Sequence, residues 1–322
     1  MSVRPIFIFS APRSGSTVLQ RVLAAHRDVT TASEPWLLLP MLTPLYDDLP
    51  APGARDPLIR EALEDFIAEL PNGRVDYRAA IRDSALALYE GVTDQNATYF
   101  VDKTPLYHLV VDEIFETFPD AKFLFLFRNP LSVVASCVEL FDDGRWEVAR
   151  YHAALFESLA YLAPASVKYA SRSLTVRFED LVMGGEAPLR RILEYLELPW
   201  EPRIIEQFAS VELRGRMGDL TGTVAYSALS QEPIEKWRAT ICNPVRRAWC
   251  SRYLRWLGRE RLAVMGYDVD QLREQLKTTS GCRYRTSDDV RIMAASLVRE
   301  LVKARLPRYT SRASTWHALL RD

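Results

Sequence analysis

A loop of small and polar residues follows a short apolar run near the start of the chain and has the composition of a phosphate-binding loop. Its central residues are Arg13, Ser14, Gly15, Ser16 and Thr17, and apolar residues at helical spacing come after them. In a buried strand that turns through such a loop into a helix, the free N–H groups of the loop and of the first helical turn point to one place. The sequence therefore predicts an anion site, most simply for a phosphate. The alternative is an ordinary strand-to-helix turn with a capping serine.

The position of the cation separates this loop from the common nucleoside-triphosphate loop. That loop ends in Gly-Lys-Ser/Thr, and its lysine reaches the outer phosphates. Here Ser16 follows Gly15, and the cation is Arg13, which precedes the glycine. A P-loop kinase needs the lysine and a metal-holding acid, so this loop favours a different kind of phosphate ligand.

Three more charged residues, Glu34, Lys103 and Arg128, stand directly after predicted strands, as Arg13 does. The strands are predicted at residues 28–33, 98–102 and 122–127. They alternate with helical segments, which indicates a parallel sheet with right-handed crossovers. Because ligands bind at the carboxyl ends of such strands, we expect these four residues to lie at one edge of the sheet. For Glu34 alone, the alternative is a helix-capping or first-turn acid of a helix expected from Pro35 to Leu42.

The rest of the pattern predicts an α/β fold with a P-loop-type parallel sheet flanked by helices. Helical periodicity at 57–70 and 77–89 indicates a helical insertion between strands, which we expect to shape the substrate pocket. A further strand at 174–178 precedes more helices. We assign residues 1–278 to this domain and residues 279–322 to a basic, helical C-terminal extension.

These motifs resemble those of sulfotransferases that use 3′-phosphoadenosine 5′-phosphosulfate (PAPS). The loop is similar to their Pro-Arg-Ser-Gly-Thr-Thr form, which binds the 5′-phosphosulfate. Arg128 and the serine eight positions later, Ser136, resemble their 3′-phosphate-binding segment. Two separate anion sites distinguish a 3′,5′-bisphosphorylated nucleotide from ATP. The resemblance implies that PAPS is bound without a metal ion by Arg13, Ser14, Gly15, Ser16, Thr17, Arg128 and Ser136.

The resemblance extends to the branch that contains tyrosylprotein sulfotransferases and many bacterial enzymes. In that branch a glutamate downstream of the loop arginine serves as base, and Glu34 is similarly placed, 21 positions after Arg13. Lys103, in an Asp-Lys-Thr-Pro segment, resembles a further catalytic cation of the branch. Pro105 stands where cytosolic small-molecule sulfotransferases have a catalytic histidine. The resemblance thus implies catalytic roles for Glu34, Arg13 and Lys103.

The implied reaction moves the sulfuryl group of PAPS to an acceptor hydroxyl by in-line displacement, with Glu34 as the base. The residues do not indicate whether the acceptor is a small molecule, a carbohydrate, a lipid or a peptide. Two alternatives stay open, a kinase-like transferase and a non-catalytic protein that binds 3′-phosphoadenosine 5′-phosphate (PAP). The oligomeric state is open too, as is a nucleotide contact from the Arg/Gly-rich segment at 214–219.

The composition of the chain indicates which binding partners and which cellular location to expect. The net charge of −1 gives no reason to expect a nucleic-acid partner. The first residues do not resemble a signal peptide, and the four cysteines lack metal-ligand spacing, so we expect reduced thiols in a cytoplasmic protein. Residues 283–322 hold nine Lys/Arg and four Asp/Glu. They are interpreted either as a docked amphipathic helix or as a basic helix in peripheral contact with an anionic membrane or an acidic acceptor.

Overall fold

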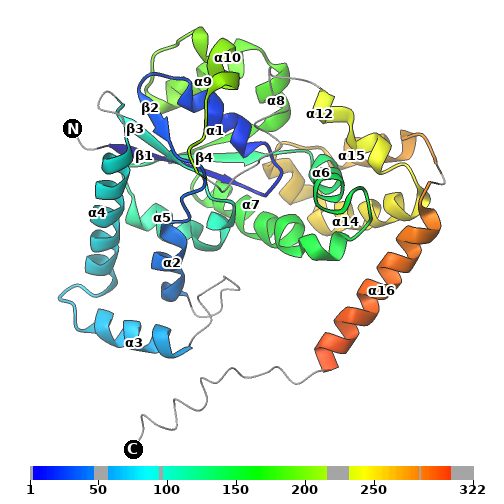
Figure 1. The fold of residues 1–322 in the computed structure, drawn as a ribbon, viewed down its shortest axis with the longest axis horizontal. Coiled ribbons are helices and arrows are strands. Elements are labelled where there is room, and N and C mark those ends of the chain that lie inside the picture. The colour runs from blue at the N-terminus through cyan, green and yellow to red at the C-terminus, as the bar shows by residue number, and fades with distance from the viewer. Residues whose placement is uncertain (1–2, 47–56, 94–96, 216–231, 283, 306–322) are drawn as a thin grey trace, which may run out of the picture.

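The fold is built on a parallel sheet, as the sequence predicts. The computed structural model describes residues 3–46, 57–93, 97–215, 232–282 and 284–305. In this part of the chain, five strands pair in the order β2-β3-β1-β4-β5, all of them parallel (Figure 1). The strands are β1 (Arg4–Ser10), β2 (Val29–Thr31), β3 (Tyr99–Asp102), β4 (Lys122–Phe127) and β5 (Ser173–Arg177).

Alternate residues of the two central strands enter two different hydrophobic cores. Phe7 in β1 and Phe123 in β4 belong to an aromatic core, whereas Ile8 and Leu124 belong to an aliphatic one. All four side chains are fully buried. A sheet covered on both faces needs apolar residues at every strand position, which explains the nearly continuous apolar run of β4.

The aliphatic core lies between the sheet and a small group of helices. This group comprises α1 (Ser16–Ala24), α8 (Phe178–Met183), α9 (Glu186–Leu196), α10 (Arg203–Gln207) and η5 (Phe208–Ser210). In Figure 1 these helices lie above the sheet.

The aromatic core is closed by the larger group of helices. They are α2 (Leu38–Leu42), η1 (Thr43–Leu45), α3 (Pro57–Ala68), α4 (Arg74–Val92), η2 (Pro105–Val110), α5 (Val111–Thr117), α6 (Pro130–Asp142), η3 (Val148–Tyr151), the π-helix η4 (Ala153–Glu157), α7 (Ser158–Lys168), α13 (Trp237–Thr240), α14 (Pro244–Val264) and α15 (Val269–Thr278). The predicted helical insertion is formed by α3 and α4.

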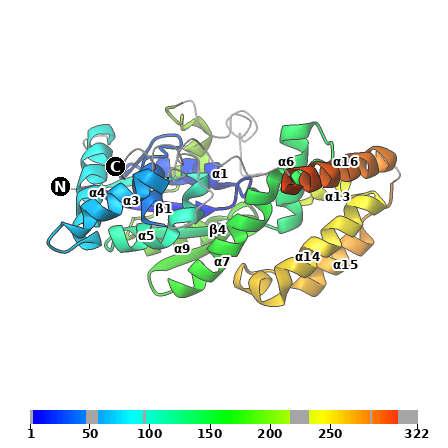
Figure 2. The ribbon, with the colours of Figure 1, turned by 90° about the horizontal axis from the view of Figure 1, so that it is seen from below.

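The last helices connect the C-terminal segment to the sheet domain. The short helix α12 (Glu232–Glu235) precedes α13, and α16 (Thr286–Arg305) follows α15. Figures 1 and 2 show α16 as a straight helix that projects from the end of the molecule formed by α13 and α14. Within the described residues, no helix is both long enough and apolar enough to pass through a membrane. The boundary at residue 278 and the membrane contact of 283–322 stay predictions.

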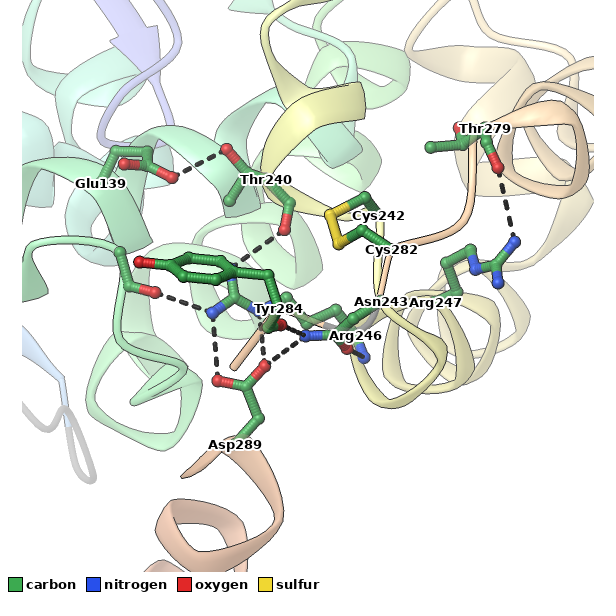
Figure 3. The surroundings of a disulfide bond; sticks show 11 residues. Glu139, Thr240, Cys242, Asn243, Arg246, Arg247, Thr279, Cys282, Tyr284 and Asp289 are labelled. Carbon is green, nitrogen blue, oxygen red and sulfur yellow. Dashed lines mark hydrogen bonds and ion pairs between the residues drawn. A yellow bond between two sulfur atoms is a disulfide. The ribbon is translucent and has the colours of Figure 1, made fainter. Parts of the chain in front are cut away.

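A disulfide bond corrects the expectation that all four cysteines are reduced. Cys242 and Cys282 are joined across 40 positions of sequence, while Cys137 and Cys250 are buried free thiols (Figure 3). The N–H of Cys282 also donates to the carbonyl of Cys242 at 3.2 Å. Cys242 precedes α14 and Cys282 follows α15, so the two cysteines meet only because these helices fold back on each other. The spacing of the cysteines in the sequence does not predict this pairing.

Buried polar contacts beside the disulfide hold the start of α16 against α14. The Arg246 guanidinium binds both oxygens of the Asp289 carboxylate, at 2.7 and 3.0 Å, and the Asn243 amide donates to the same carboxylate at 2.6 Å (Figure 3). The Asp289 side chain is fully buried. The segment after residue 278 is therefore fixed at its base by both a covalent and an ionic connection.

Removing the disulfide should weaken the fold. We expect Cys282→Ser to lower the free energy of unfolding by about 2 to 4 kcal/mol, because the bond restricts a long loop in the unfolded chain. Thermal unfolding with and without a thiol reductant checks this. The reductant should lower the Tm of the wild type and leave that of the variant unchanged, and an unchanged wild-type Tm would contradict the prediction.

Candidate active site

The strand order sets the order of the four charged residues along the carboxyl edge of the sheet. Glu34 follows β2, Lys103 follows β3, Arg13 follows β1 and Arg128 follows β4. Neighbouring strands lie about 4.8 Å apart, so residues after adjacent strands can reach one another. The structure brings the four residues together as two neighbouring pairs, Glu34 with Lys103 and Arg13 with Arg128.

The loop between β1 and α1 is turned by two residues in the left-handed region of backbone space. Arg13 has φ of 67° and Gly15 has φ of 88°. Between them, the N–H of Ser14 donates to the carbonyl of Ala11 at 3.2 Å, which closes the turn. Ser16 and Thr17 add the first N–H groups of α1, which have no partner within the helix. The start of α1 therefore supplies N–H groups of the kind that the predicted anion site requires, and the site itself stays a prediction.

Position 15 requires glycine because there is no room for a side chain, and also because its φ is positive. A Cβ at this position would lie 2.2 Å from a ring carbon of Phe178, which is fully buried at the start of α8. Any larger residue would force the loop away from the ring. Phe178 thus fixes how closely the loop approaches β5 and α8.

The loop and the segment after β4 contact each other directly. Arg128 Nη1 donates to the carbonyl oxygen of Arg13 at 2.9 Å, and Arg13 Nε donates to Ser136 Oγ in α6 at 3.1 Å. The Arg128 guanidinium also lies over the Phe178 ring, 4.7 Å from its centroid. The two segments predicted to bind different phosphates are therefore adjacent, with their cations held between them.

Glu179 supports the turn that carries Arg128. Its buried carboxylate accepts the N–H of Asn129 at 2.9 Å and the hydroxyl of Tyr267 at 2.6 Å. Asn129 in turn caps α6, because its side-chain oxygen accepts the N–H of Leu131 at 3.0 Å. Local sequence did not identify these supporting roles, since Glu179 and Tyr267 are 88 positions apart.

Glu34 forms a nearly buried ion pair with Lys103. Lys103 Nζ lies 2.6 Å from Glu34 Oε1, and the two side chains are 2% and 10% exposed. The indole N–H of Trp36 donates to Glu34 Oε2 at 3.3 Å. The interpretation of Glu34 as a first-turn helix acid is wrong, because α2 begins at Leu38 and Trp36 has a φ of 54° that helical backbone does not allow.

Other side chains that the sequence did not single out hold the Glu34 segment in place. The amide of Gln20 in α1 donates to the carbonyl of Ala32 at 2.7 Å. On the other side, the N–H of Ser33 donates to the carbonyl of Arg214 at 2.9 Å. The start of the Arg/Gly-rich segment thus lies beside Glu34, while residues 216–219 lie outside the described residues and their nucleotide contact is untested.

A buried carboxylate precedes Lys103. Asp102 Oδ2 accepts the hydroxyls of Tyr89 at 2.6 Å and of Tyr107 at 2.8 Å, and Oδ1 accepts that of Thr104 at 3.3 Å. Burial raises the pKa of Asp102 to about 6, and the three hydroxyls and the Lys103 cation offset only part of that rise. These tyrosines resemble ordinary core residues in the sequence, so the network was not predictable from it.

The raised pKa gives a prediction for stability against pH. Because the folded-state pKa of Asp102 lies above its ordinary value of 3.8, its contribution to the free energy of unfolding is largest below pH 3.8 and is lost as the pH rises through about 6. The shift corresponds to about 3 kcal/mol. Because pH 4 already lies above 3.8, relative to Asp102→Asn the wild type should be about 2 kcal/mol more stable at pH 4 than at pH 7. Urea unfolding of both proteins at both pH values checks this, and a constant difference would contradict it.

Comparison with known protein families identifies the family to which this chain belongs. The model of the Sulfotransferase family matches residues 5–202, which is more than half of the chain and includes all four strand-end residues. The chain belongs to the sulfotransferase family. Membership supports an enzyme that transfers sulfuryl groups, and it agrees with the resemblance found in the loop and in the segment after β4.

Relatives found by the sequence comparison cover different shares of the chain. The nodulation protein NoeE of Sinorhizobium fredii (strain NBRC 101917 / NGR234) is 32% identical over 130 residues, which are 40% of this chain and 30% of NoeE. Protein-tyrosine sulfotransferase A of Caenorhabditis elegans is 25% identical over 260 residues, which are 74% of this chain and 62% of that protein. The chain therefore spans less than two thirds of either relative.

A solved sulfotransferase structure shares the fold. The sulfotransferase domain of the Synechococcus PCC 7002 olefin synthase aligns with a TM-score of 0.51 at 22% identity, and the alignment covers 74% of this chain and 88% of that domain. The α/β sheet with helices on both faces is thus the fold of a sulfotransferase.

Proposed function

We propose that this chain transfers the sulfuryl group of PAPS to an acceptor hydroxyl, with Glu34 as the general base. The observation that carries the proposal is the direct contact between the two anion-binding segments. Arg128 donates to the backbone of Arg13, and Arg13 donates to Ser136. The two segments therefore lie next to each other, which supports a nucleotide with phosphates at both its 3′ and 5′ positions.

The residues fit the two ends of such a nucleotide differently. The N–H groups of the loop and the hydroxyls of Ser14, Ser16 and Thr17 are assigned to the 5′-phosphosulfate, because the loop leads into α1, whose dipole favours an anion there. Arg128 and Ser136 are assigned to the 3′-phosphate, for which a guanidinium offers a planar fork of donors. Lys in the ATP-loop position is absent, which favours this nucleotide over ATP.

PAPS supplies the sulfuryl group and leaves as PAP. Glu34 takes the proton of the acceptor hydroxyl while that oxygen forms its bond to sulfur and the bond from sulfur to the bridging oxygen of the 5′-phosphate breaks. Lys103 and Arg13, which follow the neighbouring strands β3 and β1, stabilise the negative charge that develops on the bridging oxygen. These cations serve in place of a metal ion, as the comparable clamp of phosphoryl transfer does together with Mg²⁺.

A peptide tyrosine is the first acceptor to test. Relatives that cover about three quarters of the chain are named protein-tyrosine sulfotransferases. Carbohydrate and small-molecule hydroxyls belong in the same assay, because the residues of the insertion formed by α3 and α4 do not select one class of acceptor.

An assay with labelled donors tests the proposal. The purified chain is incubated with ³⁵S-labelled PAPS and separate pools of tyrosine-containing peptides, carbohydrates and small alcohols, with EDTA present, and in parallel with γ-labelled ATP. We expect label transfer from PAPS alone, and tighter binding of PAP than of AMP in calorimetry. Transfer from ATP would favour a kinase-like enzyme, and binding of PAP without transfer to any pool would favour a non-catalytic protein.

A further inference from the structure

Two backbone N–H groups of the segment that carries Glu34 are bound by hydroxyls. The N–H of Trp36 donates to Thr104 Oγ1 at 3.2 Å, and the N–H of Leu38 donates to the hydroxyl oxygen of Tyr107 at 3.3 Å. A hydroxyl that accepts such a hydrogen bond must direct its own hydrogen elsewhere. Both of these hydroxyls donate to the carboxylate of Asp102.

The Asp102 carboxylate therefore fixes the orientation of the hydroxyl groups of Tyr107 and Thr104. It is fully buried, and an ionised carboxylate only accepts hydrogen bonds, so it holds the hydrogens of Tyr107 and Thr104 away from the Glu34 segment. Asp102 also precedes Lys103 in the chain. One residue is therefore connected both to the catalytic cation and, through two hydroxyls, to the backbone two and four positions after Glu34.

We propose that Asp102 is a positioning residue that sets the Glu34 carboxylate against Lys103, acting through the hydroxyls of Tyr107 and Thr104. The proposal rests on the proposed function, because it assigns a reason for the geometry of the catalytic pair. It also explains why a polar network lies in the aromatic core, where hydrophobic residues would otherwise pack.

Tyr89 provides a matched control for Tyr107. Both hydroxyls donate to the same oxygen, Asp102 Oδ2, and both side chains are buried, at 2% and 0% exposure. Only the Tyr107 hydroxyl also accepts an N–H from the Glu34 segment. Removing either hydroxyl costs the carboxylate one hydrogen bond, but only removal of the Tyr107 hydroxyl releases the segment.

Two readouts on Tyr107→Phe and Tyr89→Phe test the proposal. In hydrogen exchange, the peptide covering residues 34–42 should exchange faster in Y107F than in the wild type and should be unchanged in Y89F. In the sulfuryl-transfer assay, Y107F should lower kcat at least tenfold while the KM for PAPS stays within twofold, and the loss in Y89F should be at least fivefold smaller. Equal losses in both variants, or a loss that appears in the KM, would show a purely structural role and overturn the proposal.

The outcomes also separate this proposal from the proposed function. Hydrogen exchange needs no donor or acceptor, so it tests the Asp102 network even if the wild type transfers no sulfuryl group. If Y107F does not fold, Thr104→Val tests the same network through Trp36 and should reproduce the exchange and kcat changes expected for Y107F. An unchanged exchange rate at 34–42 in T104V would then overturn the proposal.

Discussion

Replacing Glu34 with glutamine is expected to lower kcat at least a hundredfold and to leave the affinity for PAP within twofold of wild type. The amide is isosteric but accepts no proton, and a positioned general base contributes about 10²- to 10⁴-fold to the rate. The residues that we assign to the nucleotide follow β1 and β4, whereas Glu34 follows β2, so binding of PAP should not depend on the charge of Glu34. Steady-state kinetics with PAPS and calorimetry with PAP measure the two effects.

A second ion pair in the protein controls for the loss of a buried charge. Glu34→Gln leaves Lys103 without its carboxylate partner, which by itself could destabilise the fold. Glu113 pairs with Arg78 at 2.7 Å, and its side chain is 10% exposed, as that of Glu34 is, while Arg78 is 23% exposed and Lys103 is 2% exposed. This pair joins α4 to α5, so Glu113→Gln should lower the Tm and keep kcat within about threefold. If E34Q also stays within a few-fold of wild type, Glu34 is not the base.

The sequence predicts the members of the site better than their contacts. Each of the first four strands is followed within three residues by one of the charged residues Arg13, Glu34, Lys103 and Arg128, so these could be placed at one edge without a structure. Which of them touch depends on the order of the strands, which is set by how the helices pack on the two faces. The ion pair between Glu34 and Lys103 follows from the adjacency of β2 and β3, and local sequence does not contain that information.

The differences between expectation and structure have physical causes. Pro35 favours a helix start, but the left-handed backbone of Trp36 delays α2 to Leu38, because the Trp36 N–H and indole are bound by Thr104 and Glu34. The disulfide and the Asp102 network join residues that are distant in sequence. Long-range pairs of this kind arise only once the sheet and its helices have brought the chain together.

The selectivity for a 3′-phosphate should depend on Arg128. We expect Arg128→Met to reduce the ratio of PAP affinity to AMP affinity at least thirtyfold, which corresponds to about 2 kcal/mol for a lost charge-assisted contact. The side chain also holds the loop through the carbonyl of Arg13, so binding of AMP should weaken as well. The ratio cancels this shared loss and isolates the 3′-phosphate. Calorimetric titration of each nucleotide gives both constants.

Two serines of α6 provide graded controls for Arg128. Ser136 Oγ accepts from Arg13, so Ser136→Ala should lower the PAP-to-AMP ratio by a smaller factor, about threefold to tenfold, as expected for one hydroxyl. Ser132 lies one turn earlier, and its hydroxyl donates to the carbonyl of Ile234 at 3.3 Å, so Ser132→Ala should leave the ratio within twofold. If R128M binds PAP and AMP with the wild-type ratio, the 3′-phosphate is not held at the end of β4. The contact between the two segments would then be a structural one, and the assignment of PAPS as donor would lose the observation that carries it.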